Sequence, residues 1–148
     1  MREPLLISAC LLGENCKYNG GNNYTSEVEL LRERYILLPI CPEQDGGLPT
    51  PRESSERLGD SVVSKSGADV TACFQRGAQH ALDTACAHGC THALLKERSP
   101  SCGCGAIYDG TFTGTVVEGD GVTAQLLQQH GITVYGESRI QELLERLR

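Results

Sequence analysis

Residues 93–105, ALLKERSPSCGCG, join a short apolar run to a loop rich in Ser, Pro, Gly and Cys. Together with the two residues before it, this run predicts a buried strand over residues 91–96. In α/β sheets, functional side chains lie just beyond the carboxyl ends of the strands. The segment therefore predicts a buried strand followed by a functional loop that contains Ser101 and Cys102.

Two other apolar runs also lead into a cysteine. Residues 4–10 end at Cys10, and residues 36–40 are followed directly by Cys41. The run at 36–40 is continuously apolar, which predicts a strand buried on both faces, as strands of parallel sheets are. If these strands and the strand at 91–96 are parallel neighbours, their carboxyl ends meet at one edge of the sheet. We therefore expect the thiols of Cys10, Cys41 and Cys102 to converge there.

Helical patterns alternate with the predicted strands. Apolar residues recur at helical spacing between residues 70 and 85, and Gly89 is placed to end that helix. Further helices are predicted at residues 26–35, at 122–130 and from 138 onward, with a short fourth strand at 132–134. This alternation predicts an α/β fold, a single three-layer, Rossmann-like domain over residues 1–148, with helices on both faces of a mostly parallel sheet.

Three local signals are weaker. Residues 41–56 hold three Pro and two adjacent Gly, and they predict a loop without regular structure. Residues 61–71 give a weak hairpin signal around Ser66-Gly67. Ser26, with Glu29 three positions on, predicts a capping box at the start of the helix that follows.

Composition narrows the class of protein. The 148-residue chain holds eight cysteines and carries a net charge of −6. It is long enough to bury a core without disulfides, and it has neither a basic and apolar leader nor a run near the roughly 20 apolar residues that cross a bilayer. We therefore expect a cytoplasmic protein, in which grouped thiols are more often a metal or redox site than a disulfide framework. The negative charge disfavours nucleic acid and favours a small neutral substrate.

The thiols allow more than one grouping. A soft thiolate cage suits zinc or an iron–sulfur cluster, and structural zinc usually takes four ligands as two close pairs. Three single cysteines, one from each of three strand ends, would leave one coordination position of the metal centre without a protein ligand. Two rival sets are Cys10 and Cys16 with Cys102 and Cys104, and the run Cys86, His88, Cys90 and His92. The first lacks zinc-knuckle spacing, and in the second the side chains diverge between a helix end and a strand, which favours ordinary packing roles.

Four segments, taken in order, resemble a known family. They are SACLLGENCKYNGG at residues 8–21, ICPEQDGGLPTPRESSE at 40–56, LLKERSPSCGCGAIYDGTFTG at 94–114 and GDGVTAQLLQQHGI at 119–132. The chain resembles the thiouracil desulfidases, a domain family long labelled only as of unknown function. The resemblance implies a [4Fe-4S] cluster held by only three cysteines, and removal of sulfur from a small thionated pyrimidine as sulfide, leaving uracil, without net redox change.

The resemblance also implies roles for individual residues. The family's catalytic serine falls on Ser101, beside Cys102, and its catalytic glutamate falls on Glu43. The expected ligands of the cluster and its metal are Cys10, Cys41 and Cys102. Two further thiols are left open as replacements for one of the three, namely Cys16 and Cys104.

These residue types suggest a mechanism. An iron with an open position would polarise the thiocarbonyl, while Glu43 takes a proton from a water that Ser101 positions, so that the C–S bond is hydrolysed. Two other functions stay open, a non-catalytic zinc or iron–sulfur binding module and a sulfurtransferase that uses the same cluster. The sequence indicates neither the oligomeric state nor which thionated compound is used in the cell.

Overall fold

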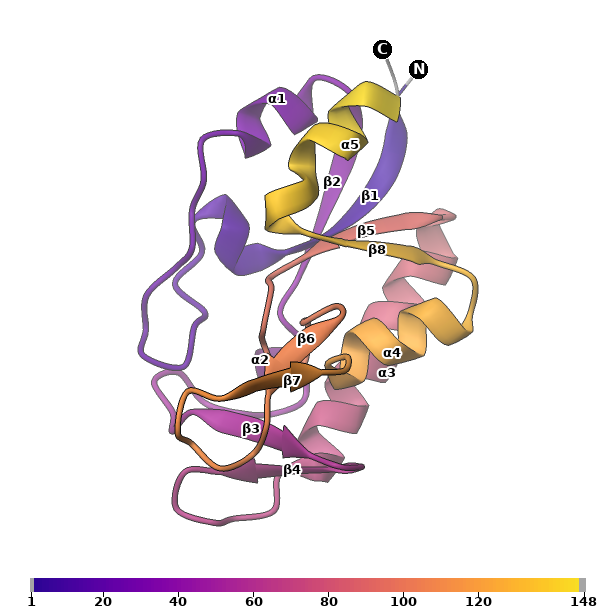
Figure 1. The fold of residues 1–148 in the computed structure, drawn as a ribbon. Coiled ribbons are helices and arrows are strands. Elements are labelled where there is room, and N and C mark those ends of the chain that lie inside the picture. The colour runs from indigo at the N-terminus through magenta and orange to yellow at the C-terminus, as the bar shows by residue number, and fades with distance from the viewer. Residues whose placement is uncertain (1, 147–148) are drawn as a thin grey trace.

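The computed structural model describes residues 2–146. Its main sheet has four parallel strands in the order β2-β1-β5-β8. These strands are β1 (Glu3–Ser8), β2 (Tyr35–Ile40), β5 (His92–Leu95) and β8 (Thr133–Gly136). The strands that precede Cys10, Cys41 and Cys102 are therefore parallel neighbours, as the sequence predicts (Figure 1).

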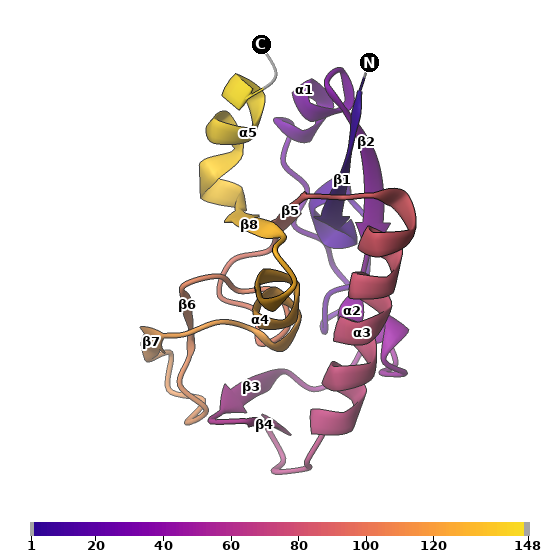
Figure 2. The same ribbon diagram turned by 90° about the vertical axis from the view of Figure 1, so that its right-hand side faces the viewer.

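Helices cover both faces of this sheet. They are α1 (Val28–Arg32), α3 (Thr71–His88), α4 (Val122–Gln129) and α5 (Ile140–Arg146). Successive residues of a strand point to opposite faces, so Leu5 and Ile7 pack with α1 and α5, while Leu6 packs with α3 and α4. Figures 1 and 2 show these two helix pairs on opposite sides of the strands. The α/β fold with a mostly parallel, doubly covered sheet is thus confirmed.

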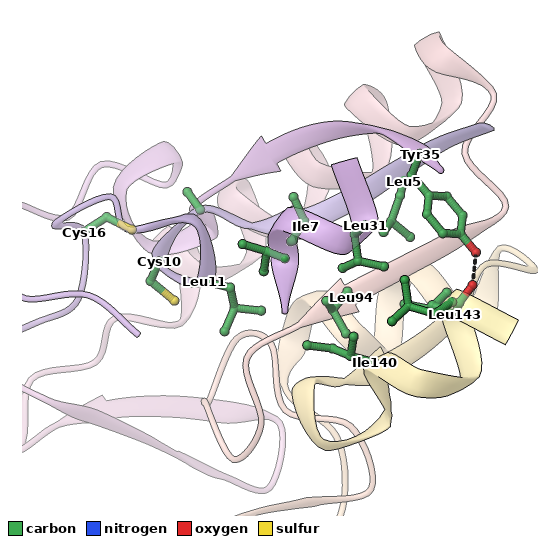
Figure 3. Packing of buried hydrophobic residues seen from close by; sticks show 13 residues of the cluster. Leu5, Ile7, Cys10, Leu11, Cys16, Leu31, Tyr35, Leu94, Ile140 and Leu143 are labelled. Atoms are coloured by element: carbon green, nitrogen blue, oxygen red, sulfur yellow. Dashed lines mark hydrogen bonds between the residues drawn. The ribbon is translucent and has the colours of Figure 1, made fainter. Parts of the chain in front are cut away.

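The core under α1 and α5 is closed at one end by a buried hydrogen bond. The hydroxyl of Tyr35 donates to the carbonyl oxygen of Leu143 at 2.6 Å, and Figure 3 shows this bond at the far end of the core from Cys10. Near it, Arg146 pairs with Glu3 at 3.4 Å between nitrogen and oxygen. The amino end of β1 is therefore held to α5, and these contacts do not involve the carboxyl end of β1, where Cys10 follows.

Short elements extend the carboxyl ends of the strands. The 3-10 helix η1 (Ala9–Leu12) follows β1, helix α2 (Pro42–Asp45) follows β2, and η2 (Glu137–Arg139) follows β8. Two antiparallel hairpins lie beyond these ends (Figure 1), one of β3 (Ser55–Leu58) and β4 (Ser61–Ser64), the other of β6 (Ala106–Tyr108) and β7 (Val116–Glu118). No helix in residues 2–146 combines the length and the apolar character that a membrane span requires.

Three local predictions are wrong, and a fourth is confirmed in part. The segment 41–56 is not free of regular structure, because it contains α2 and the start of β3. Residues 36–40 are not buried on both faces, because β2 is an edge strand in which Ile36 and Pro39 are exposed. The hairpin signal at 61–71 is confirmed in part: the chain turns at Ser66-Gly67 and Val63 bridges Asp69, but the regular partner strand of β4 is β3. The capping box does not form, because α1 begins at Val28 without a side-chain cap, and Glu29 instead accepts hydrogen bonds from Tyr24 and Arg32.

Helices α2 and α3 touch backbone to backbone. A Cβ atom on Gly77 of α3 would lie 1.8 Å from the carbonyl oxygen of Pro42, and one on Gly46 would lie 1.9 Å from the carbonyl oxygen of Cys73. Real Cβ atoms do not approach other atoms so closely, so only glycine fits at either position. This contact fixes α2, and with it Glu43, against the long helix.

Candidate functional site

The carboxyl ends of β1, β2 and β5 open into one cavity of about 720 Å³. The three expected thiols of Cys10, Cys41 and Cys102 all line it, and so does Cys16. The remaining wall includes Glu43, Ser101, Arg52, Asn23 and Lys96. The structure therefore brings all five predicted site residues into one place and adds a fourth thiol.

Cys10 lies two residues beyond the end of β1, rather than at the end of the strand as the sequence predicts. The strand ends at Ser8, and Cys10 belongs to η1, which Gly13 closes with a φ of 96°. The backbone N–H of Asn23 donates to the Cys10 carbonyl oxygen at 2.9 Å, and the Asn23 side-chain amide donates to Cys10 Sγ at 3.3 Å. The loop 14–24 thus folds back over Cys10 and brings Cys16 to the cavity.

Cys41 stands at the junction of β2 and α2. It is the N-cap residue of α2, and its backbone N–H donates to Asp45 Oδ2 at 3.3 Å. Pro42 occupies the first helical position, where its missing N–H costs nothing. The Sγ atom of Cys41 lies 3.8 Å from the carbonyl oxygen of Cys16, so the α2 end and the 14–24 loop meet at this thiol.

A tight turn presents Ser101 and Cys102. The side-chain oxygen of Ser99 accepts hydrogen bonds from the backbone N–H groups of Ser101 and Cys102, both at 3.1 Å. The Gly103 N–H closes the turn on the Ser99 carbonyl oxygen at 2.9 Å. Ser99 therefore organises the loop, and its spacing of three from Cys102 is a side-chain turn signal that could have been read from the sequence.

Helix α4 holds the same turn from outside. The first N–H groups of a helix have no partner within the helix, and in α4 those of Val122 and Thr123 donate to the carbonyl oxygens of Pro100 and Ser101 at 2.9 and 2.8 Å. A Cβ atom on Gly121 would lie 2.5 Å from the carbonyl carbon of Ser101. The absence of a side chain at Gly121 lets α4 come close enough to fix the turn.

The two predicted catalytic residues contact each other. The hydroxyl of Ser101, which is 2% exposed, donates to Glu43 Oε2 at 3.3 Å. Because the Ser101 hydroxyl proton is used in this bond, the Ser99 hydroxyl is the donor in the second bond, to Ser101 Oγ at 2.9 Å. The other carboxylate oxygen of Glu43, Oε1, accepts from Arg52 Nε at 3.0 Å. Ser101 Oγ also lies 3.5 Å from Cys102 Sγ, so these polar groups adjoin the thiols directly.

The four thiols differ in how readily they ionise. Cys16 donates to its neighbours, which lowers the pKa of Cys10 to about 7 and also lowers the pKa of Cys41. The same hydrogen bonds raise the pKa of Cys16 far above that of a free thiol. Burial raises the pKa of Cys102 to about 12. The thiolate is the form that binds metals, so the lowered pKa values of Cys10 and Cys41 favour their metal-binding form, whereas burial disfavours it at Cys102.

The rival thiol groupings fail. Cys104 does not line the cavity, because its Sγ lies 3.7 Å from the carbonyl oxygen of Val134 and packs in the core under α3 and α4. In the run 86–92, Cys86 is exposed on α3 while Cys90 is buried in that same core, so these side chains diverge as expected. Within residues 2–146, no three His, Cys, Asp or Glu side chains lie close enough together to hold a single metal ion.

Several site residues carry no usable sequence signal. Arg52 follows a Pro-Thr-Pro segment with no periodic pattern, yet it is buried against Glu43. Asn23 is one of several Asn in an irregular loop. Lys96 lines the cavity and pairs with Glu137 at 2.8 Å, a contact that depends on β8 lying beside β5.

Comparison with known proteins gives consistent matches over nearly the whole chain. A family model described as 2-thiouracil desulfurase matches residues 5–139. The chain is 39% identical over 150 residues to the uncharacterized protein YbbK of Bacillus subtilis (strain 168), which covers 95% of this chain and 99% of that protein. It is also similar to the solved structure of a [4Fe-4S]-dependent thiouracil desulfidase, TudS (DUF523Vcz), with 47% identity and a TM-score of 0.92, covering 99% of this chain and 98% of the other.

Proposed function

Because the chain belongs to the 2-thiouracil desulfurase family, we propose that it is an iron–sulfur-dependent desulfidase acting on thiouracil-type pyrimidines. In this proposal, residues 1–148 act in the cytoplasm as a single domain, and water replaces the sulfur of a small thionated base. The overall reaction is thiouracil plus water giving uracil plus hydrogen sulfide, with no net oxidation or reduction. The observation that carries the proposal is the Glu43–Ser101 contact in a cavity lined by thiols.

The donor set fits an iron–sulfur cluster. Cysteine thiolates are the usual ligands of such clusters, and we assign Cys10, Cys41 and Cys102 to this role because they reach one cavity from three neighbouring strand ends.

Cys16 is given a different role. Cys16 enters the cavity from the irregular 14–24 loop rather than from a strand end, and its hydrogen bonds to Cys10 and Cys41 raise its pKa while they lower theirs. Hydrogen bonds to ligand sulfurs tune iron–sulfur clusters. We therefore assign Cys16 as a donor to two ligands rather than as a fourth ligand, which leaves one cluster iron without a protein donor.

When bound, the cluster supplies a soft Lewis acid that draws electron density from the thiocarbonyl carbon through its sulfur. The chain's own residues supply the proton chemistry. Ser101 Oγ holds the attacking water, and Glu43 Oε2, which now accepts the Ser101 proton at 3.3 Å, accepts the proton of that water. The same carboxyl group can later return a proton to the departing sulfide.

The first test replaces the proposed proton acceptor. Anaerobically reconstituted Glu43→Gln should keep about four irons and the broad visible absorption of the cluster, because Glu43 is not a proposed ligand. Its sulfide release from 2- or 4-thiouracil should fall by roughly 10²–10⁴-fold, the usual contribution of a general base. Full activity in this variant would remove Glu43 from the mechanism.

A matched control and a second readout complete this experiment. Glu53 lies in the same segment but is exposed and accepts from Ser66, so Glu53→Gln should behave like the wild type. Uracil and free sulfide are measured together. Formation of uracil without free sulfide would instead indicate a sulfurtransferase, and colourless protein with one zinc would indicate a binding module.

A further inference from the structure

Arg52 is buried at the back of the proposed site. Its side chain is only 7% exposed, and it pairs through Nε with Glu43 Oε1 at 3.0 Å. Its Nη1 donates to Thr50 Oγ1 at 2.9 Å and to the Pro49 carbonyl oxygen at 3.1 Å, and its Nη2 donates to the Cys16 carbonyl oxygen at 2.9 Å. All three nitrogens of the guanidinium are therefore used, each on a fixed partner.

These contacts restrict the Glu43 carboxylate. The terminal torsion of a glutamate is soft and broad, so the carboxylate plane would otherwise turn freely. Arg52 binds Oε1 and leaves Oε2 to accept from Ser101 at 3.3 Å. The planar guanidinium thus fixes the plane of the carboxylate, so that its second oxygen is directed at the serine.

The same side chain joins two segments of the cavity wall. Its Nη2 donates to the Cys16 carbonyl oxygen, and that oxygen lies 3.8 Å from Cys41 Sγ. The Arg52 backbone N–H also donates to the Tyr18 carbonyl oxygen at 2.7 Å. Arg52 therefore holds the 14–24 loop and α2 at a fixed separation, which a lysine, with a single ammonium group, cannot reproduce.

From this geometry we propose that Arg52 is a positioning residue for desulfuration, which acts by holding Glu43 with Oε2 toward Ser101. The inference rests on the proposed function of the Glu43–Ser101 pair. In this role Arg52, which lines the cavity beside Glu43, acts on the reaction by orienting that carboxylate. Its effect on turnover should therefore depend on the carboxylate that it orients, which separates this role from simple support of the fold.

A double-mutant cycle tests that dependence. Arg52→Met in the reconstituted enzyme should lower kcat by about 10–100-fold, since misplacement of a catalytic group by about 1 Å costs on this order. KM for thiouracil should change less than about threefold. In the Glu43→Gln background the same substitution should cause less than a threefold further loss, because the group that Arg52 orients has already been removed.

Two further variants and one non-kinetic readout complete the design. The kcat of Arg52→Lys should lie between those of Arg52→Met and the wild type. If Arg52→Met does not fold, Arg52→Lys takes its place in the double-mutant cycle. Arg76→Met is the control, because Arg76 donates to the Gly46 carbonyl at the other end of α2 without touching Glu43, and its kcat should match the wild type. Iron content and visible absorption should stay at the wild-type level in every variant.

The outcomes separate this inference from the function itself. Equal losses from the Arg52 substitution in the wild-type and Glu43→Gln backgrounds would overturn the positioning role, as would wild-type kcat in Arg52→Met. Loss of iron in Arg52→Lys would also overturn it, since the residue would then be holding the cluster loop. A wild-type enzyme that carries four irons and releases no sulfide would instead refute the proposed function.

Discussion

Gly77→Ala should destabilise the protein, although helix propensity alone predicts the opposite. Alanine in place of glycine inside a helix normally stabilises by about 1 kcal/mol. Here the new Cβ would lie 1.8 Å from the Pro42 carbonyl oxygen, whereas ordinary contact begins near 3.4 Å. Helices α2 and α3 would have to separate by about 1.6 Å, the difference between these two distances.

The size of the two effects decides the sign. Forcing extra volume into a packed contact costs about 1–3 kcal/mol, and the upper end applies because Pro42 presents backbone rather than a flexible side chain. After the helix gain of about 1 kcal/mol is subtracted, we expect a net loss of about 2 kcal/mol. For a chain of this length that lowers Tm by roughly 4–8 °C.

Thermal unfolding of the cluster-free proteins, followed by circular dichroism, measures this loss. Gly21→Ala is the control, because its Cβ would meet only the Asn19 side chain, at 3.1 Å for the nearest atom, and its Tm should change by much less. In the reconstituted enzyme, displaced α2 would also carry Glu43 away from Ser101 and lower kcat. A Tm for Gly77→Ala equal to or above that of the wild type would refute the reasoning.

Three further predictions concern the thiols and the core. Cys10→Ser, Cys41→Ser and Cys102→Ser should each abolish the bound cluster, whereas Cys16→Ser should keep about four irons by elemental analysis, and loss of iron there would make Cys16 a ligand. In cluster-free protein, alkylation of Cys10 should rise steeply as pH increases through about 7, where its lowered pKa makes it a thiolate, while Cys102 should stay unlabelled below pH 9, as mass spectrometry can show. Tyr35→Phe should cost about 1–3 kcal/mol in urea unfolding, because the buried Leu143 carbonyl loses its donor; an unchanged midpoint would contradict this.

Continuous apolar runs were enough to predict the sheet. Strands β1 and β5 are buried between two helical layers, so the runs that form them are apolar. The equally apolar run 36–40 forms an edge strand, in which Ile36 and Pro39 are exposed. Gly89 ends α3 as predicted, with a φ of 69° that other residues rarely adopt. Helix α2 was missed because its local sequence favours a loop, and it forms where two glycines allow backbone contact with α3.

The site was predictable only in part. Strand-end reasoning placed Cys10, Cys41 and Cys102 in one cavity, because the position of a strand end depends on local sequence. The arrival of Cys16 depends on the 14–24 loop folding back through Asn23, a tertiary contact that no period or spacing encodes. The roles expected of Ser101 and Glu43 came from family resemblance, and their contact required the folded chain.

The ion pair between Glu3 and Arg146 has a practical consequence for handling the protein. It lies at the amino end of β1, whereas the cavity opens at the carboxyl end, about 20 Å away for a strand of six residues. An affinity tag, a surface anchor or a fusion partner attached next to Glu3 or Arg146 would therefore stand clear of the thiols. The nearness of these two residues also suits circular permutation, in which a short linker joins the two positions and the chain is opened in an exposed loop.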